Sequence, residues 1–167
     1  MSRTQWRALA AVTLLLTGSG ILAAAAGPAQ AADPVPPAMP KMTNIRTGLN
    51  TGFDRVVLDL TSGPAPSVSY QLVDELTADA SGEIVWLTGE FFINVAVTPA
   101  AAHDDSGNPT YPGPTKFRTR NLHNVMAVAV TGDFEGQVSI GLGVRSRTAV
   151  NVFTLTAPNR VVIDVAN

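Results

Sequence analysis

The chain contains no cysteine. This excludes a disulfide framework, a lipid-modified cysteine anchor and a thiol nucleophile, so an ordinary apolar core must stabilise the fold. Histidine is scarce too, because His103 and His123 are the only two. Hydrolytic zinc needs three ligands and an open position, and adjacent residues such as His103, Asp104 and Asp105 seldom converge on one ion. We therefore expect neither a metal nor another cofactor.

The sequence also lacks the usual signatures of catalysis. It has no G-x-S-x-G elbow, and no serine stands in a context that predicts activation by a histidine. The spacing of the Asp and Glu residues does not select two of them as a glycosidase pair. These absences predict a protein that is not an enzyme.

The N-terminus has the pattern of an export signal. Arg3 and Arg7 precede an apolar run at residues 8–16, and the Ala-Gln-Ala sequence at 29–31 fits a cleavage site. We expect residues 1–31 to be a signal peptide and the protein to be secreted. Contact with a membrane is expected only if this segment is retained as an anchor.

The remainder is expected to be one domain on a short tether. After cleavage, about 136 residues remain, with nine cations against 13 acidic residues. This acidic balance argues against a nucleic-acid partner. Four prolines within residues 32–43 predict an extended linker, and residues 44–167 form the predicted domain.

The predicted domain is all-β, because short alternating segments recur with turn signals between them and no long helical period competes. In two of the segments, aliphatic residues alternate cleanly and should face inward. Two small, mainly antiparallel sheets packed as a sandwich satisfy this pattern. The predicted strands number about eight and cover residues 55–60, 67–74, 83–88, 91–98, 124–131, 136–144, 150–156 and 160–165.

Two of these segments are nearly identical, RVVLDL at 55–60 and RVVIDV at 160–165. If they pair antiparallel with 55 opposite 164 and 59 opposite 160, each Arg meets an Asp across the ladder. The alternative is that they occupy equivalent places in two different sheets. In either arrangement, the residues of this charged motif are predicted to be structural: Arg55, Asp59, Arg160 and Asp164.

Several segments, taken in order, resemble the AMIN-like domain of exported bacterial proteins, a relative of the AMIN domain. They lie at residues 51–60, 98–104, 109–114, 132–136, 153–155 and 158–165. The resemblance implies a β-sandwich that serves as a noncatalytic module in cell-envelope proteins. AMIN domains accompany peptidoglycan amidases and secretins, where they are associated with targeting to peptidoglycan.

The candidate ligand site is the long, Pro-rich loop at residues 99–121, since loops of this length are usually functional or disordered. We expect an ordered loop in which Tyr111 offers an exposed stacking surface. In an extended segment, alternating cations share one side, and Arg is geometrically suited to carboxylates and phosphates. The predicted cationic residues are Lys116, Arg118 and Arg120, extended by Arg145 and Arg147 if their strand end lies nearby.

Other features leave alternatives open. The cations are also explained as a solvated face balanced by acidic residues. Trp86 lies within a predicted strand and is expected in the core. Ser139, Gly141 and Gly143 form a flat strand face, which a glycan, another backbone or the Pro-rich loop is able to cover.

The expected function is that of an exported, noncatalytic module that binds peptidoglycan or an associated anionic wall polymer. The alternative is a protein-interaction or assembly module that docks a partner in the envelope. A third class, a metal-dependent hydrolase built on His103, has the least support in the sequence.

Overall fold

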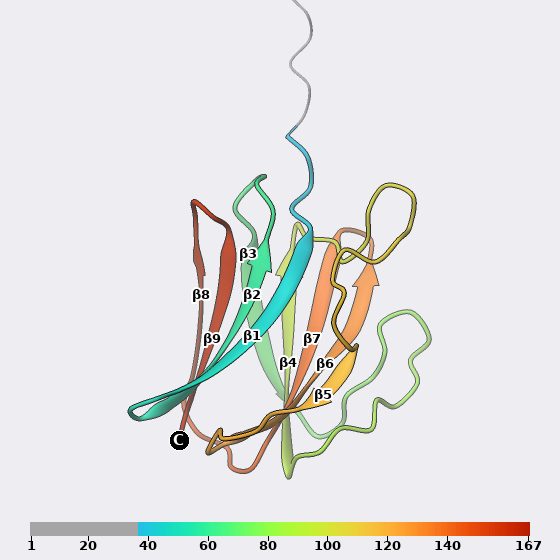
Figure 1. Ribbon diagram of the computed structural model, residues 1–167. Coiled ribbons are helices and arrows are strands. Elements are labelled where there is room, and N and C mark those ends of the chain that lie inside the picture. The colour runs from blue at the N-terminus through green and yellow to red at the C-terminus, as the bar shows by residue number, and fades with distance from the viewer. Residues whose placement is uncertain (1–36) are drawn as a thin grey trace, which may run out of the picture. The chain divides into compact units, whose positions relative to one another are not determined.

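The structure is a computed structural model that describes residues 37–167 of the protein. These residues contain nine β-strands (Figure 1). None of these residues belongs to a helix long and apolar enough to cross a membrane. The predicted signal peptide and residues 32–36 of the predicted linker lie outside the described residues. The strands are β1 (Met42–Asn50), β2 (Phe53–Leu60), β3 (Ser67–Val73), β4 (Phe91–Thr98), β5 (Lys116–Arg118), β6 (Val125–Phe134), β7 (Gln137–Val144), β8 (Val150–Leu155) and β9 (Arg160–Ala166).

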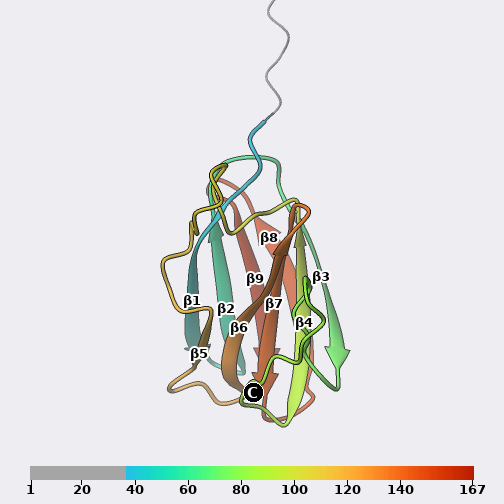
Figure 2. The same cartoon turned by 90° about the vertical axis from the view of Figure 1, so that its right-hand side faces the viewer.

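The strands form two antiparallel sheets that pack face to face (Figure 2). The first sheet has the order β1-β2-β9-β8, and the second has the order β3-β4-β7-β6-β5. Val56, Leu58 and Ile163 of the first sheet share one buried core with Ile93 and Ile140 of the second. The predicted all-β sandwich is confirmed, with the alternating aliphatic residues of β4 and β7 facing inward as expected.

The two similar sequences form the central pair of the first sheet. β2 and β9 pair antiparallel, with Arg55 opposite Asp164 and Asp59 opposite Arg160. This is the register in which each Arg faces an Asp across the ladder. Because both strands belong to one sheet, the alternative of equivalent places in two sheets is excluded.

Three segments differ from the predicted strands. The sequence predicts no strand at β1 or β5, and it predicts one at residues 83–88, where the structure has an isolated bridge between Thr77 and Ile84. β1 is an edge strand with many exposed polar residues, so its sequence lacks a clear alternation of apolar and polar side chains. The predicted domain boundary after residue 43 falls inside β1, whose first residue, Met42, is fully buried.

Residues 74–90, here called the strap, cross the outer face of the second sheet. The side chain of Leu76 occupies the space where a Cβ on Gly141 would lie, and the backbone at Thr88 and Gly89 comes equally close to Gly143. The flat face of β7 is therefore covered by another backbone of the same chain. The covering segment is the strap and not the Pro-rich loop.

A buried carboxylate, that of Asp54 on β2, connects the two sheets. It accepts hydrogen bonds from the backbone N–H groups of His123, Asn124 and Val125 at 3.2, 2.6 and 2.8 Å, and from Asn167 Nδ2 at 2.8 Å. Burial alone would raise the pKa of Asp54, but these four hydrogen bonds outweigh it and lower the pKa below its ordinary value. The carboxylate thereby fixes the start of β6 against β2.

The Asn124 side chain extends this connection to the turn between β7 and β8. Its Nδ2 donates to the carbonyl of Ala166 at 2.8 Å and to Thr148 Oγ1 at 2.9 Å. Its Oδ1 accepts from the backbone N–H groups of Arg145 and Ser146 at 3.0 and 2.9 Å. One buried polar network therefore positions the start of β6, the end of β7 and the end of β9.

We expect Asp54→Asn to lower the free energy of unfolding by about 2–4 kcal/mol, because the new NH₂ group would face backbone donors in a buried site. Since the folded-state pKa of Asp54 is lowered, its stabilisation is present above the ordinary carboxyl range and is lost as pH falls through that pKa. Urea unfolding followed by circular dichroism should show the difference from wild type at pH 7 and its decrease in acid. Asp105→Asn, at an exposed carboxylate, is the matched control, and an equal loss there would contradict the prediction.

The strap generates a second prediction. Gly143→Ala should destabilise the domain by about 1–3 kcal/mol, because a Cβ at this position would push against the backbone of Thr88 and Gly89. Gly48→Ala is the control, since a Cβ there meets no atom within 4 Å. Chemical unfolding of both variants measures the difference, and equal stability would mean that the strap does not press on β7.

Candidate functional site

Strand β5 presents two of the predicted cations. Lys116 pairs with Ala129 of β6 and Arg118 pairs with Ala127, while Phe117 between them packs against the core. Because side chains alternate along a strand, Lys116 and Arg118 point together to the outer face of the second sheet. Both side chains are exposed.

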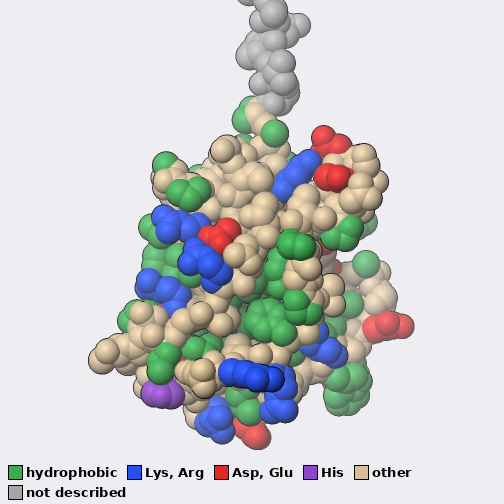
Figure 3. Space-filling model, viewed as in Figure 1, with side chains coloured by type: hydrophobic (Ala, Val, Ile, Leu, Met, Phe, Trp, Pro, Cys, Tyr) green, Lys and Arg blue, Asp and Glu red, His purple; other side chains and the backbone are tan. Residues whose placement is uncertain are grey.

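Arg120 and Arg145 lie near the same end of the sandwich, where β6 begins. Arg120 follows β5 in the connection to β6. On the other flank of β6, the Arg145 backbone N–H donates to the Asn124 carbonyl at 2.9 Å, and its Nε donates to the His123 carbonyl at 3.2 Å. Figure 3 shows Lys and Arg side chains gathered at this lower end.

Four exposed cations, here called the cationic end, have no carboxylate within 4.0 Å among residues 37–167. Arg147 differs from them, because it pairs with Asp74 at 2.8 Å and lies over the Phe91 ring at 4.8 Å. The cationic end therefore has charge available for a ligand, whereas Arg147 is already engaged. Its members are Lys116, Arg118, Arg120 and Arg145.

Trp86 of the strap lies beside the cationic end. Its side chain is 78% exposed, and its carbonyl accepts a hydrogen bond from Lys116 Nζ at 2.9 Å. Trp86, Lys116 and Arg118 line a hollow of about 310 Å³. The prediction of a core tryptophan is wrong, because the strap is not a strand and buries Leu76 in place of Trp86.

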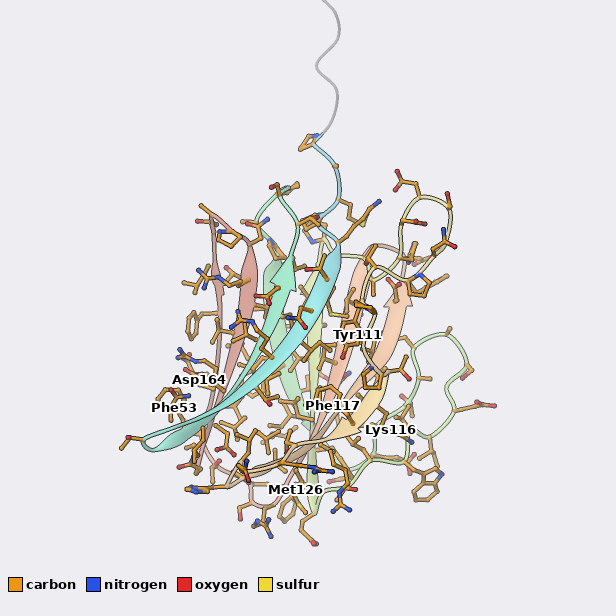
Figure 4. All side chains as sticks on the ribbon, viewed as in Figure 1. Phe53, Tyr111, Lys116, Phe117, Met126 and Asp164 are labelled. Carbon is orange, nitrogen blue, oxygen red and sulfur yellow. The ribbon has the colours of Figure 1, made fainter. Side chains whose placement is uncertain are left out.

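Tyr111 is not an exposed stacking surface. It is half-buried and packs against the core, and burial raises the pKa of its hydroxyl. It lines a different hollow from Lys116 and Arg118, and Figure 4 shows it above both Phe117 and Lys116. The expectation from loop position fails because the 99–121 segment packs back onto both sheets.

The charged motif of β2 and β9 is bonded within the first sheet. Arg55 makes two hydrogen bonds of 2.7 Å to Asp164, and its guanidinium lies 5.0 Å from the Phe53 ring centroid. Asp59 accepts two bonds of 2.7 Å from Arg46 of β1, and these bonds lower its pKa. Arg160 faces Asp59 in the ladder but forms no ion pair with it among the described residues.

The acidic turn near His103 is also bonded internally. His103 Nδ1 lies 2.6 Å from Asp133 Oδ2, and Asp104 Oδ1 accepts from the backbone N–H groups of Ser106 and Asn108 at 2.9 and 2.8 Å. These hydrogen bonds lower the pKa of Asp104. Within residues 37–167, no three His, Cys, Asp or Glu side chains are grouped so that they could hold a metal ion.

Sequence reasoning placed Trp86 in the core and did not identify the buried polar groups Asp54 and Asn124. The flat face of β7 was a signal for the strap, since it permits close approach by another backbone. It did not identify which segment approaches or which side chain that segment leaves exposed. The role of Asp54 cannot be predicted from local sequence, because its partners are backbone N–H groups about 70 residues away.

Structural and surface cations should respond differently to mutation. We expect Arg55→Gln to lower the free energy of unfolding by about 1–2 kcal/mol, because a bidentate pair and aromatic packing are lost. Arg118→Gln should leave the free energy of unfolding nearly unchanged, since the side chain is exposed and has no ion pair in the described part. Urea unfolding of both variants checks this, and a larger loss for Arg118→Gln would assign it a structural role.

A family model, described as the AMIN-like domain, matches residues 40–167. Neither a curated protein nor a solved structure matches the chain. The matched residues include all nine strands, the strap and the cationic end. The chain therefore belongs to the AMIN-like domain family, whose members are usually part of exported proteins of the cell envelope.

Proposed function

We propose that this chain is an exported, noncatalytic module that binds peptidoglycan or an associated anionic wall polymer through its cationic end. The observation that carries the proposal is a group of four exposed cations without carboxylate partners in the described part, beside an exposed tryptophan. The predicted signal peptide adds support for a place outside the cytoplasm. The domain as a whole is acidic, so this charge is local.

The chemistry of the site fits a polyanion that carries sugar rings. Arg118, Arg120 and Arg145 each offer a planar guanidinium that can donate two hydrogen bonds to a carboxylate or phosphate. Lys116 adds a compact positive charge, and the ring of Trp86 offers an apolar face with a polar edge. Exposed ion pairs contribute at most about 1 kcal/mol each, so useful affinity requires several contacts on one polymer.

Two observations support the noncatalytic part of the proposal. In the described part of the chain, the polar side chains nearest His103 and Asp104 are engaged in structural hydrogen bonds. The chain also lacks a cysteine nucleophile. Binding without chemistry is therefore the simplest role for the cationic end.

The second candidate is a protein-interaction module. The observation that favours it is the edge strand β3, where Tyr70 and Leu72 remain 40% and 48% exposed. Edge strands can add a strand from a partner, and exposed apolar side chains give such pairing its specificity. This candidate predicts capture of a protein and no affinity for protein-free wall.

Co-sedimentation of the purified full-length chain with protein-free peptidoglycan is the test. We expect saturable binding that weakens as salt rises, because salt screens exposed charges. The double variant Arg118→Gln/Arg120→Gln should bind about tenfold more weakly, since two contacts of roughly 0.7 kcal/mol each are lost. Trp86→Ala should weaken binding without changing its salt dependence.

The matched control is Lys41→Gln/Arg46→Gln, which removes the same charge from cations that are paired with Asp105 and Asp59. It should bind within about twofold of wild type. If both double variants lose the same affinity for peptidoglycan, binding depends only on net charge, and the cationic end is not a specific site. No saturable binding by the wild type would reject wall recognition in favour of a protein partner.

A further inference from the structure

A second hollow lies under the first half of the long loop. Hydrogen bonds hold this loop to both sheets: Met42 N–H donates to the Ala101 carbonyl at 2.7 Å, Thr110 Oγ1 donates to the Met42 carbonyl at 2.8 Å, and Val130 N–H donates to the Thr115 carbonyl at 2.7 Å. The loop thus joins β1 of one sheet to β6 of the other. Between these attachments it borders an open pocket of about 480 Å³.

The pocket wall is mainly apolar, with one polar pair. Pro109, Tyr111 and Val130 supply apolar surface over the buried Met42, and the polar pair is His103 with Asp133. Hydrophobic side chains are visible on this face around the position of Tyr111 (Figures 3 and 4). Ligand sites typically have this size and combine apolar walls with a few polar groups.

Hydrogen bonding defines what the polar pair can offer. Asp133 Oδ1 accepts from the Ala102 backbone N–H at 2.9 Å, and Asp133 Oδ2 lies 2.6 Å from His103 Nδ1. Because an ionised carboxylate can only accept, Nδ1 carries the proton whenever the imidazole is in its neutral form. The lone pair on His103 Nε2 then remains as an acceptor, and no described residue donates to it.

Charge around the pocket restricts the ligand further. Asp133 lies in the pocket and Asp104 in the adjoining hollow that shares His103, whereas Lys41 in that hollow is paired with Asp105, so the local charge disfavours an anion. A cation would find both Asp133 oxygens already engaged and an apolar wall that cannot solvate it. A neutral ligand with a hydrogen-bond donor is the complement of this site.

We infer that this pocket binds a small neutral molecule that has an apolar body of one or two rings and a hydroxyl group. The hydroxyl donates to His103 Nε2, and the rings lie against Tyr111 and Val130. A cavity of about 150 Å³ holds one benzene ring, so two fused rings have room here. The site is separate from the cationic end and does not depend on the function proposed for it.

The test uses 2-naphthol, titrated into the purified full-length chain and followed by calorimetry. Two matched probes have the same rings: 2-methoxynaphthalene lacks the donor, and 2-naphthoate is an anion. We expect saturable binding of 2-naphthol, about three- to tenfold tighter than binding of 2-methoxynaphthalene, and the weakest binding for 2-naphthoate. No binding of 2-naphthol at millimolar concentration, or equal binding of the first two probes, would overturn the inference.

Two variants locate the binding. Thr115→Phe places a ring into the pocket from an exposed position and should abolish binding of both neutral probes, whereas Thr77→Phe on the strap should leave binding unchanged. His103→Phe should keep the apolar contacts and remove the preference for 2-naphthol. Circular dichroism checks that each variant folds. Full 2-naphthol affinity in folded Thr115→Phe would overturn the assignment to this pocket.

Discussion

The carboxylate of Asp54 is the interaction on which much of the structure depends. A charge this deeply buried is tolerated because three backbone N–H groups and Asn167 Nδ2 satisfy it. The bonds join β2 of one sheet to the start of β6 in the other, and Asn124 carries the connection on to Arg145. The position of Arg145 thus follows from a buried hydrogen-bond network, whereas the pairing of β5 with β6 positions Lys116 and Arg118.

The two candidate sites use different connections between the same sheets. The strap brings Trp86 to Lys116 and Arg118 on an outer face, where the ligand would meet charge and an exposed ring. The long loop borders an apolar space beside His103, where a ligand would meet mainly apolar surface. A β-sandwich fold does not by itself define function, and here the two long connections supply the chemistry.

The sequence predicts those parts of the fold that have a local period or a repeat. Alternation identifies β4 and β7, and opposite charges favour the observed register of β2 and β9. The sequence does not predict edge strand β1, because most of its residues are exposed and its apolar and polar side chains do not alternate clearly. The environments of Tyr111 and Trp86 depend on which segment packs on which sheet, which is tertiary information. The expected exposures of these two aromatic residues are therefore the reverse of those observed.

The central pair of the first sheet also affects when the domain can fold. β2 and β9 join residues 53–59 to residues 160–166, so the pair closes a loop of roughly a hundred residues. Contacts of such long separation form slowly. During synthesis, β2 has no neighbour on its β9 side until residue 160 has emerged. Until then, β2 lacks half of its backbone hydrogen-bond partners, so the first sheet is completed only when the last strand of the domain is available.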